Sequence, residues 1–376
     1  MHEGVESVIK QFHLPGTLVS VAPLAQGHIN DTYILTSEDG GRVVRHVLQR
    51  INHEVFKDPP GMMENILRIT EHIRNKALTT DPQLAARQLS VLCTDSGAGY
   101  WMDADGNYWR MYDFVEQAVT YDTVDSAGLA FEAARMFCWF QRMLEDLPGP
   151  ALHDTIPDFH NTPLRLEQFQ EAQKKDPCNR AKNIEKEIEF LLKHVKICNF
   201  LTDYVKKGEF LCRISHNDAK INNVMFDERT GRGVCIIDLD TVMPGLSIYD
   251  FGDLVRTVAN PANEDEPDLS KVTLDIAMFT ALARGFAKET SEFLTPIEKE
   301  HLAFGGKLIT FEQFIRFLTD YLKGDVYYKI HREGHNLDRS RTQMKLVQSI
   351  IEQEDTMNEI VRSAFEEQKS RGAKKD

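Results

Sequence analysis

The first third of the chain alternates apolar and polar residues, and this period of two predicts β-strands. Turn residues such as Glu38-Asp39-Gly40-Gly41 separate the alternating stretches. Over residues 61–76 the spacing becomes helical, directly after Asp58-Pro59-Pro60, which is a typical helix start. Residues 1–115 are therefore predicted to form an antiparallel sheet with one long helix. The predicted strands are 17–23, 31–36, 42–51, 89–94 and 107–115.

Beyond Glu116 the apolar residues follow the longer period of α-helices. Residues 222–238 depart from this period, because Val224-Met225-Phe226 and Val234-Cys235-Ile236-Ile237 flank a polar turn and predict a β-hairpin. We therefore predict an α+β fold of two lobes, a β-sheet lobe over 1–115 and a mainly helical lobe over 116–376. The predicted helices of the second lobe are 126–147, 183–205, 269–289, 296–322 and 343–365.

The most informative motif is His216-Asn217-Asp218, which is followed by Asn223 and, across the predicted hairpin, by Asp238. A hairpin returns the chain to its start, so Asp238 is expected beside Asn223. Phosphoryl transfer requires a carboxylate for the acceptor hydroxyl and oxygen ligands that hold Mg²⁺ on the nucleotide phosphates. Asp218 is the candidate catalytic base, and Asn223 and Asp238 are the candidate metal ligands. His216 is expected to brace the loop.

Three residues near this motif have weaker roles. Lys220 is close enough in sequence to touch a transferred phosphate, but an exposed loop lysine explains it equally well, and it stays outside the predicted site. Asp240 points to the side of Asp238 in an extended chain, which leaves open a second metal ligand or a substrate contact. Asp250-Phe251-Gly252 spells the metal-binding triplet of protein kinases. No strand paired with the catalytic loop precedes it, so Asp250 is predicted to bond backbone N–H groups.

The first lobe holds candidate nucleotide contacts. Residues 26–33 form a turn with a single glycine that suits a polyphosphate or a sugar, although a simple hairpin turn explains it as well. Arg50 ends the third predicted strand and is the candidate cation for the α- and β-phosphates, with a solvated strand residue as the alternative. Tyr112, Phe114 and Val115 lie where the sheet lobe meets the helical lobe, and they are candidate contacts for the nucleotide base.

The charge of the chain narrows the class of ligand. Asp and Glu total 58 against 44 for Lys and Arg, and the formal net charge of -14 argues against nucleic acid as a partner. A small molecule that carries phosphate then needs a local cation, a metal ion or backbone N–H groups. The charge therefore predicts a magnesium-dependent site for a small substrate.

Cysteine spacing and hydropathy indicate the compartment. The six cysteines form no Cys-x-x-Cys pair, so buried reduced thiols are predicted rather than disulfides or a zinc site. No apolar run approaches the ~18 residues of a membrane span, and the first residues lack the pattern of a secretion signal. We expect a cytoplasmic protein that uses no membrane and is a monomer or a weak homo-oligomer.

Several further motifs are not generic features of kinases. They are Gly27-His28-Ile29-Asn30, Val47-Leu48-Gln49-Arg50-Ile51-Asn52, Phe159-His160-Asn161-Thr162-Pro163, Arg316-Phe317-Leu318, Gly324-Asp325-Val326-Tyr327 and His335-Asn336-Leu337. Together with the catalytic loop, they make nearly the whole chain resemble the aminoglycoside phosphotransferase and choline kinase-like superfamily. Within that superfamily, the chain is most similar to the bacterial N-acetylhexosamine 1-kinases.

This resemblance implies a two-lobed protein-kinase-like fold that binds ATP and Mg²⁺. It further implies transfer of the γ-phosphate to the anomeric 1-hydroxyl of an amino sugar, N-acetylglucosamine or N-acetylgalactosamine. Asp218 would then be the base. The residues that the resemblance assigns to the sugar are His28, Asn30, Arg316 and Tyr327. Without the resemblance, Arg316 and Tyr327 look like surface and packing residues of helices.

Two alternatives remain. The first is a kinase for another small acceptor, such as choline, an amino alcohol, homoserine or an aminoglycoside. A cationic acceptor needs an aromatic or acidic cage, so Arg316 beside the cleft disfavours it. The second is a catalytically silent nucleotide-binding protein on a kinase fold, and the intact Asp218, Asn223 and Asp238 argue against it.

Overall fold

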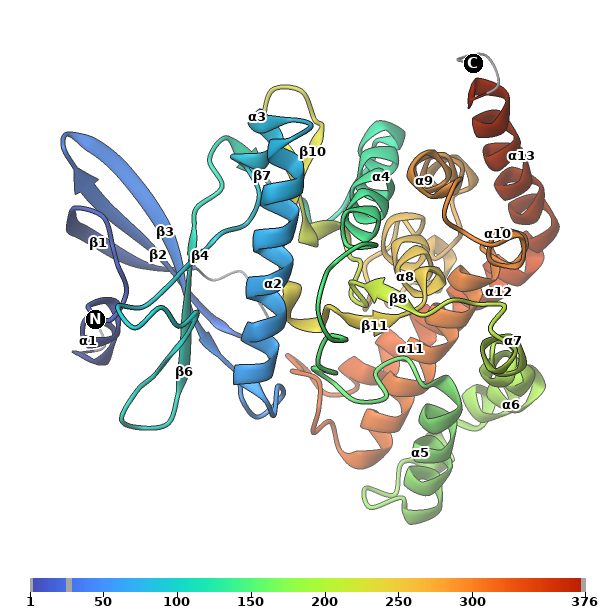
Figure 1. Ribbon diagram of the computed structural model, residues 1–376. Coiled ribbons are helices and arrows are strands. Elements are labelled where there is room, and N and C mark those ends of the chain that lie inside the picture. The colour runs from blue at the N-terminus through green and yellow to red at the C-terminus, as the bar shows by residue number, and fades with distance from the viewer. Residues whose placement is uncertain (1–2, 25–28, 373–376) are drawn as a thin grey trace.

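The computed structural model describes residues 3–24 and 29–372. A β-sheet forms one end of the molecule and a group of helices the other, with α2 lying between them (Figure 1). The elements of the sheet region are α1 (Glu3–Ile9), β1 (Thr17–Leu24), β2 (Asp31–Asp39), β3 (Arg42–Ile51), α2 (Pro59–Leu78), α3 (Pro82–Ala85), β4 (Val91–Leu92), β5 (Trp101–Met102) and β6 (Tyr108–Asp113).

The sheet of the first region is antiparallel, as predicted. Its strand order is β1-β2-β3-β6-β4, and β5 pairs with β6. Side chains alternate between its two faces, so Leu35, Leu48 and Met111 pack on one face with α1. Ile51 and Tyr112 belong to the other face and join the core that includes α2. The fourth predicted strand, 89–94, is reduced to β4.

The helix α2 connects the sheet to the rest of the molecule. The Asp58 side chain accepts a hydrogen bond from the Gly61 N–H, and prolines occupy the first helical turn, where no N–H is needed. Met62, Ile66 and Ile69 recur at helical spacing and are fully buried in the largest core. Burial of each such side chain contributes about 1.5–3 kcal/mol.

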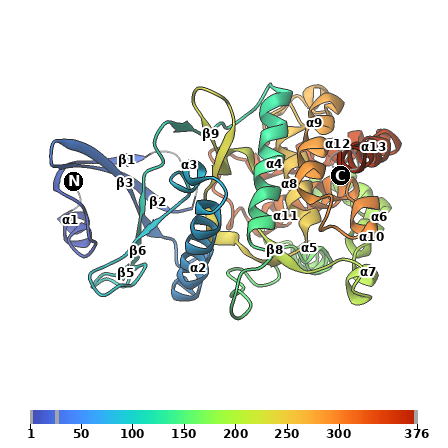
Figure 2. The ribbon, with the colours of Figure 1, turned by 45° about the horizontal axis from the view of Figure 1, so that its top comes forward.

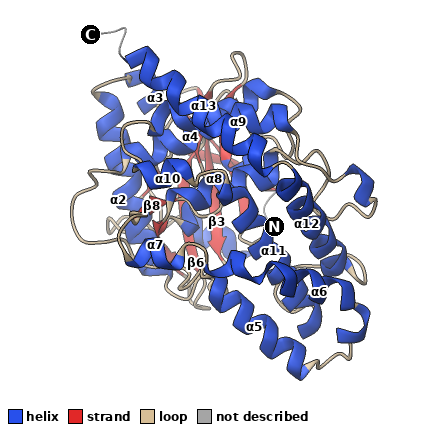
Figure 3. Ribbon diagram, turned by 90° about the vertical axis from the view of Figure 1, so that its right-hand side faces the viewer, coloured by secondary structure: helices blue, strands red, loops and turns tan. Residues whose placement is uncertain are grey.

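The second region is mainly helical, as Figures 2 and 3 show, and contains two small sheets. The hairpin β9–β10 pairs with β7, and β8 pairs with β11. The long helix α4 packs against α9, and α8 packs against α11. Its elements are β7 (Ala118–Val119), α4 (Ala127–Met143), α5 (Thr162–Lys175), α6 (Glu185–His194), α7 (Thr202–Lys206), β8 (Arg213–Ser215), β9 (Val224–Asp227), β10 (Gly233–Ile236), β11 (Met243–Gly245), α8 (Ser247–Val258), α9 (Ile276–Thr290), α10 (Pro296–Glu300), α11 (Phe304–Lys323), α12 (His335–Glu352) and α13 (Glu354–Gly372).

Some predicted helices are wrong in their extent. Residues 183–205, 296–322 and 343–365 were each expected as one helix, and each is divided in the structure. The third divides at Gln353, whose side chain donates a hydrogen bond to the Leu274 carbonyl. Hydrophobic spacing continues through such breaks, because both helices on either side bury a face in the same core.

The motif Asp250-Phe251-Gly252 lies on α8, a helix that the sequence analysis did not predict. A Cβ atom at Gly252 would collide with the carbonyl oxygen of Gly305 on α11. Glycine is therefore required for the close crossing of α8 and α11. This packing role, together with the position of Asp250 described below, accounts for the motif without a metal ion.

The sequence predicted buried, reduced cysteines and no membrane-spanning helix. All six cysteines are unpaired, but Cys178 and Cys212 are exposed, so the prediction of burial is wrong for them. Among residues 3–24 and 29–372, no helix combines the length and the apolar character needed to cross a membrane.

Candidate active site

The catalytic loop follows β8 and is held by its own backbone. The carboxylate of Asp250 accepts hydrogen bonds from the backbone N–H of His216 at 3.0 Å and of Asn217 at 2.7 Å. Asp250 is fully buried, and this burial raises the pKa of its carboxyl group. The Thr241 hydroxyl donates to the carbonyl of His216 at 2.7 Å. The prediction that Asp250 bonds backbone N–H groups is confirmed.

His216 braces the loop, as predicted. Its Nε2 donates to the carbonyl oxygen of Ile237 at 3.0 Å, directly before Asp238. The ring is fully buried and lies edge-on to Phe137, with ring centroids 5.2 Å apart. His216 therefore ties the catalytic loop to the end of the hairpin.

The backbone is strained on both sides of this tie. Asn217 and Asp238 have φ angles of 64° and 60°, in the left-handed region that residues other than glycine rarely adopt. Each such residue costs of order 1 kcal/mol and persists where surrounding contacts fix it. The hydrogen bonds of Asp250 and His216 provide these contacts.

The hairpin brings the predicted base, Asp218, and the two predicted metal ligands, Asn223 and Asp238, together. The backbone N–H of Ile237 donates to the carbonyl of Asn223 at 2.9 Å, so Asp238 follows directly beside Asn223. The Asn223 amide nitrogen donates to the carbonyl of Asp218 at 2.9 Å. Although the Asp238 side chain is partly open to solvent, desolvation by the surrounding protein and then the charges of Asp240 and Asp218 raise its pKa to about 6. The carboxylates thus repel each other across one small volume, although their catalytic roles stay predictions.

Lys220 lies among these carboxylates, although it was not predicted to belong to the site. Its Nζ is 2.9 Å from Asp218 Oδ2. Burial alone would raise the pKa of Asp218, but the Lys220 ammonium holds that pKa below its usual value. The charges of Asp218 and Asp238 raise the pKa of Lys220 in spite of its burial. Its place two residues after Asp218 was the available sequence signal.

A second ion pair joins two buried residues of α8, Asp253 and Arg256, and extends to Glu264 after the helix. The Arg256 guanidinium contacts Asp253 at 2.8 Å and Glu264 at 2.7 Å. Asp253 Oδ2 has no hydrogen-bond partner among the described residues, and its charge contributes to raising the pKa of Lys220. Neither Asp253 nor Arg256 was predicted to belong to the site.

Arg50 lies on the face of the sheet that turns away from the catalytic loop. It pairs across the strands with Asp31 and Trp109, and its guanidinium forms an ion pair with Asp31. Arg110 lies on the opposite face, is buried, and forms an ion pair with Asp240. Through this ion pair, Arg110 connects the sheet to the catalytic region. The assignment of Arg50 to the nucleotide phosphates stays a prediction.

Asp240 connects the sheet to the second region. One of its carboxylate oxygens pairs with Arg110, and the other accepts a hydrogen bond from the Asn30 amide at 2.8 Å. The Asn30 amide oxygen accepts from the Asn52 N–H at 2.9 Å. Both oxygens of Asp240 are thus occupied by protein groups. The predicted sugar contact His28 lies outside the described residues.

The predicted contacts for the nucleotide base lie on the chain that crosses between the regions. Tyr112 is buried in the sheet, and the ring of Phe114 lies 4.0 Å from the Arg45 guanidinium. Val115 is buried against Val234 of the hairpin. These contacts fix the crossing segment against the hairpin that carries Asp238.

Arg316 and Tyr327 occupy α11 and the loop after it. The Arg316 guanidinium lies 5.1 Å from the ring centroid of Phe159, and the charge of Asp218 is among those that raise the pKa of Arg316 against the effect of burial. Tyr327 has 56% of its surface exposed. Its backbone N–H donates to Asp320 at 2.9 Å. The structure therefore places Arg316 within electrostatic reach of Asp218.

Comparison with known proteins assigns the family. The model of a family described as "Phosphotransferase enzyme family" matches residues 20–274, which is more than half of the chain. The chain belongs to this family of phosphotransferases. The match includes the catalytic loop, the hairpin and α8.

Solved structures support the fold of this phosphotransferase. An aminoglycoside phosphotransferase from Alicyclobacillus acidocaldarius has a TM-score of 0.57 and 11% identity, with 96% of each chain covered. A choline kinase from Cryptosporidium parvum has a TM-score of 0.52 and 13% identity, covering 92% of this chain and 93% of that chain. A spectinomycin phosphotransferase in complex with ADP and spectinomycin has a TM-score of 0.51 and 10% identity, covering 92% and 93%. These likenesses confirm the predicted two-lobed protein-kinase-like fold.

The oxygen donors of the phosphotransferase suit a nucleotide-bound Mg²⁺ better than a protein-bound metal. Within the described ranges, no three His, Cys, Asp or Glu side chains gather as a metal cluster. Mg²⁺ typically takes one or two protein oxygens together with phosphates and water. Desolvation, together with the charges of Asp240 and Asp218, raises the pKa of Asp238, and a bound cation would favour its ionised form. Asn223 and Asp238 therefore fit the predicted ligand pair.

Proposed function

We propose that this phosphotransferase transfers the γ-phosphate of ATP to the anomeric 1-hydroxyl of an N-acetylhexosamine, N-acetylglucosamine or N-acetylgalactosamine. The observation that carries the proposal is the convergence of Asp218, Asn223 and Asp238 in one small volume. The proposed donor site and acceptor site then meet at Asp218.

Asp218 acts as the base that orients the acceptor hydroxyl. Because Lys220 holds the pKa of Asp218 below its usual value, the carboxylate is ionised at neutral pH and accepts the hydroxyl proton. Lys220 also supplies a positive charge beside the group being transferred. Phosphoryl transfer depends mainly on positioning and on charge stabilisation, and these residues supply both.

Asn223 and Asp238 hold the magnesium ion of the nucleotide. Mg²⁺, when bound, neutralises charge on the phosphates of ATP. Tyr112, Phe114 and Val115 are the proposed contacts of the base. Arg50, predicted as the cation for the α- and β-phosphates, faces away from the catalytic loop and pairs with Asp31, so we do not propose it for this role. A protein of the same fold that binds ADP supports a nucleotide at this cleft.

The acceptor side supports a neutral sugar. Arg316 and the exposed ring of Tyr327 provide a hydrogen-bond donor and a planar surface for a sugar ring. His28 and Asn30 complete the proposed contacts. The positive charge of the half-buried Arg316 disfavours a cationic acceptor beside it.

A cationic acceptor such as choline, an amino alcohol or an aminoglycoside is the second candidate. It is favoured by the concentration of carboxylates around Lys220, namely Asp218, Asp238 and Asp253. Similar folds occur in a choline kinase and in an aminoglycoside phosphotransferase.

A screen of acceptors with Mg-ATP, followed by phosphorus NMR of the product, tests the proposal. We expect N-acetylglucosamine or N-acetylgalactosamine to give a sugar 1-phosphate, and the Asp218→Asn variant serves as the control for contaminating kinases. A 6-phosphate would contradict the anomeric assignment. Phosphorylation of choline or an aminoglycoside in preference to the amino sugars would establish the second candidate.

A further inference from the structure

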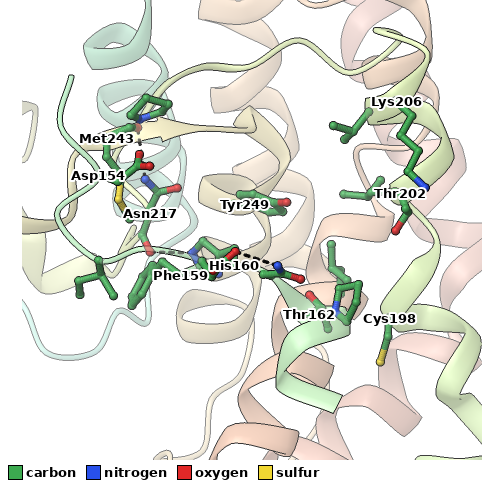
Figure 4. Close-up of a pocket in the computed structure, with 18 residues that line it drawn as sticks. Asp154, Phe159, His160, Thr162, Cys198, Thr202, Lys206, Asn217, Met243 and Tyr249 are labelled. Carbon is green, nitrogen blue, oxygen red and sulfur yellow. Dashed lines mark hydrogen bonds between the residues drawn. The ribbon is translucent and has the colours of Figure 1, made fainter. Parts of the chain in front are cut away.

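The motif Phe159-His160-Asn161-Thr162-Pro163 has no role in the site described above, yet it lies directly behind the catalytic loop. His160 bridges α11 and this loop. Its Nδ1 is 2.8 Å from Glu312 Oε1, and its Nε2 is 2.9 Å from the carbonyl oxygen of Asn217. Figure 4 shows the hydrogen bond between His160 and Asn217. Asn217 directly precedes the proposed base, Asp218.

Both partners of the His160 ring are hydrogen-bond acceptors. A backbone carbonyl only accepts, and an ionised carboxylate only accepts. Glu312 also accepts a hydrogen bond from the Thr162 hydroxyl at 2.6 Å. Burial would raise the pKa of Glu312, but the charges of His160 and Arg316 keep it below its usual value. With Glu312 ionised, both ring nitrogens of His160 must carry protons, and the ring is an imidazolium.

His216 provides a contrast within the same loop. Its Nε2 donates to a carbonyl, but its Nδ1 has no hydrogen-bond partner among the described residues. A neutral ring satisfies this arrangement. His216 belongs to the catalytic loop and His160 contacts it from behind. Only at His160 do the hydrogen-bond partners require a positively charged ring.

Few charged groups face the His160 ring. From α11 these are Glu312 and, one turn further along, Arg316; Glu312 and the Asn217 carbonyl raise the pKa of His160, whereas burial and Arg316 lower it. From α8, Tyr249 lies with its ring centroid 4.8 Å away, and burial keeps its hydroxyl neutral by raising its pKa. Cys198 lines the same cavity, and burial raises its pKa to about 12. Glu312 is therefore the carboxylate that is hydrogen-bonded to the His160 ring.

A cavity of about 560 Å³ opens on this side of the loop. His160, Asn217 and Tyr249 line it, whereas Asp218, Asn223 and Asp238 do not. Figure 4 shows His160 at its wall, between Asn217 and Thr162. The cavity gives the buried ring a route for proton exchange with solvent that bypasses the proposed active site. Asp154, Asp158 and Lys206 also line it.

We propose that His160 is a positioning residue for phosphoryl transfer, which as an imidazolium holds the peptide carbonyl of Asn217 and so fixes the catalytic loop immediately before Asp218. Asn217 is in the strained left-handed conformation, and its peptide groups are held from two directions. Asp250 accepts from its N–H, and His160 donates to its carbonyl. Through Glu312, the same contact couples the loop to α11, which carries Arg316.

The proposal gives the sign of a pH dependence. Because the folded-state pKa of His160 lies above its usual value, the stabilising contact is complete below that usual value and is lost as the pH rises through the folded-state pKa. Loss of the proton removes one of the two hydrogen bonds. The turnover number is therefore expected to fall on the alkaline side of its pH profile.

Nitrogen NMR of the histidine side chains tests the charge directly in the full chain without any acceptor. We expect the His160 signals, assigned by their absence in His160→Gln, to show two protonated nitrogens at pH 7. A neutral His160 ring at pH 7 would overturn the proposal. The exposed His13, whose ring contacts Asp95, is the reference histidine in the same spectra.

Kinetics test the positioning role, which rests on the proposed function of Asp218. His160→Ala is expected to lower kcat about tenfold to a hundredfold with less than a threefold change in the KM of ATP, and His160→Gln, which retains one donor, to recover part of the loss. Glu312→Gln should move the alkaline fall in kcat to lower pH. His13→Ala should match the wild type.

The outcomes separate this inference from the proposed function. Folded His160→Ala with wild-type kcat and an unchanged pH profile would overturn the positioning role. If His160→Ala does not fold, His160→Gln and Glu312→Gln decide the matter by the same pH profile. If the wild type phosphorylates no acceptor, the proposed function fails, and the NMR measurement still decides the charge of His160.

Discussion

Two loops of the second region are built around the same device and differ in what they present. In the catalytic loop, the buried Asp250 accepts the backbone N–H groups of His216 and Asn217. In the loop after α11, the backbone N–H groups of residues 326, 327 and 328 donate hydrogen bonds to the buried Asp320, which lies in the last turn of α11. A carboxylate that accepts several N–H bonds stabilises an irregular backbone without regular secondary structure.

The side chains of the two loops differ in exposure. His216 and Asn217 are buried and make further contacts with the protein. Val326 and Tyr327 are 73% and 56% exposed, and Ile330 is also exposed. The catalytic loop therefore has its geometry fixed on all sides, whereas the second loop has a fixed backbone with free side chains. Under the proposed function, we therefore expect changes in the catalytic loop to act on kcat and changes in the loop after α11 to act on the KM of the acceptor.

The largest expected effect tests the catalytic loop itself. Asp218→Asn should lower kcat by about 10³-fold or more, because it removes the acceptor of the hydroxyl proton while keeping the shape of the side chain. The melting temperature should change little. Steady-state kinetics with saturating Mg-ATP measure the loss, and near-full turnover would contradict the assignment of the base.

Asp238→Asn should abolish activity and yet stabilise the protein at neutral pH. The folded-state pKa of Asp238 is raised to about 6, so its ionisation costs stability as the pH rises from about 4 to that value. Because the Asp238 side chain is exposed and solvent screens its charge, its removal should add less than about 1 kcal/mol to the free energy of unfolding at pH 8 without metal. Denaturant unfolding at pH 8 and pH 4.5 measures this gain, which should shrink at the lower pH.

Asp320→Ala should weaken the second loop without affecting the first. The variant leaves three backbone N–H groups without their acceptor and removes one of the two acceptors of the Asn336 amide, which costs about 1–3 kcal/mol of stability. The acceptor KM should rise about tenfold or more, while the KM of ATP stays within about twofold. A fall in kcat as large as that of Asp218→Asn would contradict the proposed division between the loops.

Tyr327→Ala should have the smallest effect. The ring is exposed and contributes little to folding, so the melting temperature should be unchanged. Loss of a stacking surface should raise the acceptor KM about three- to tenfold. Val326→Ala is the matched control on the same loop, with an even more exposed side chain. Equal KM values for both variants would show that the Tyr327 ring makes no specific contact.

The sequence by itself determined the local structure and part of the candidate site. Alternation over residues 17–51 is a property of neighbouring residues, and it predicted β1 and β3 to within one residue and β2 from its start to three residues before its end. The hairpin between Asn223 and Asp238 is equally local, because a turn of fixed type returns the chain by a short path. The proximity of these two residues therefore followed from spacing alone.

Only the tertiary structure decided which distant residues meet. The pairs Arg110–Asp240 and His160–Glu312 lie 130 and 152 residues apart in sequence. No periodicity encodes such pairs, because they depend on how α11 and the sheet pack against the catalytic loop. The side of the sheet on which Arg50 lies was likewise decided by register, since a shift of one residue reverses the face of every side chain. Packing, rather than local preference, determined the charges that surround the catalytic loop.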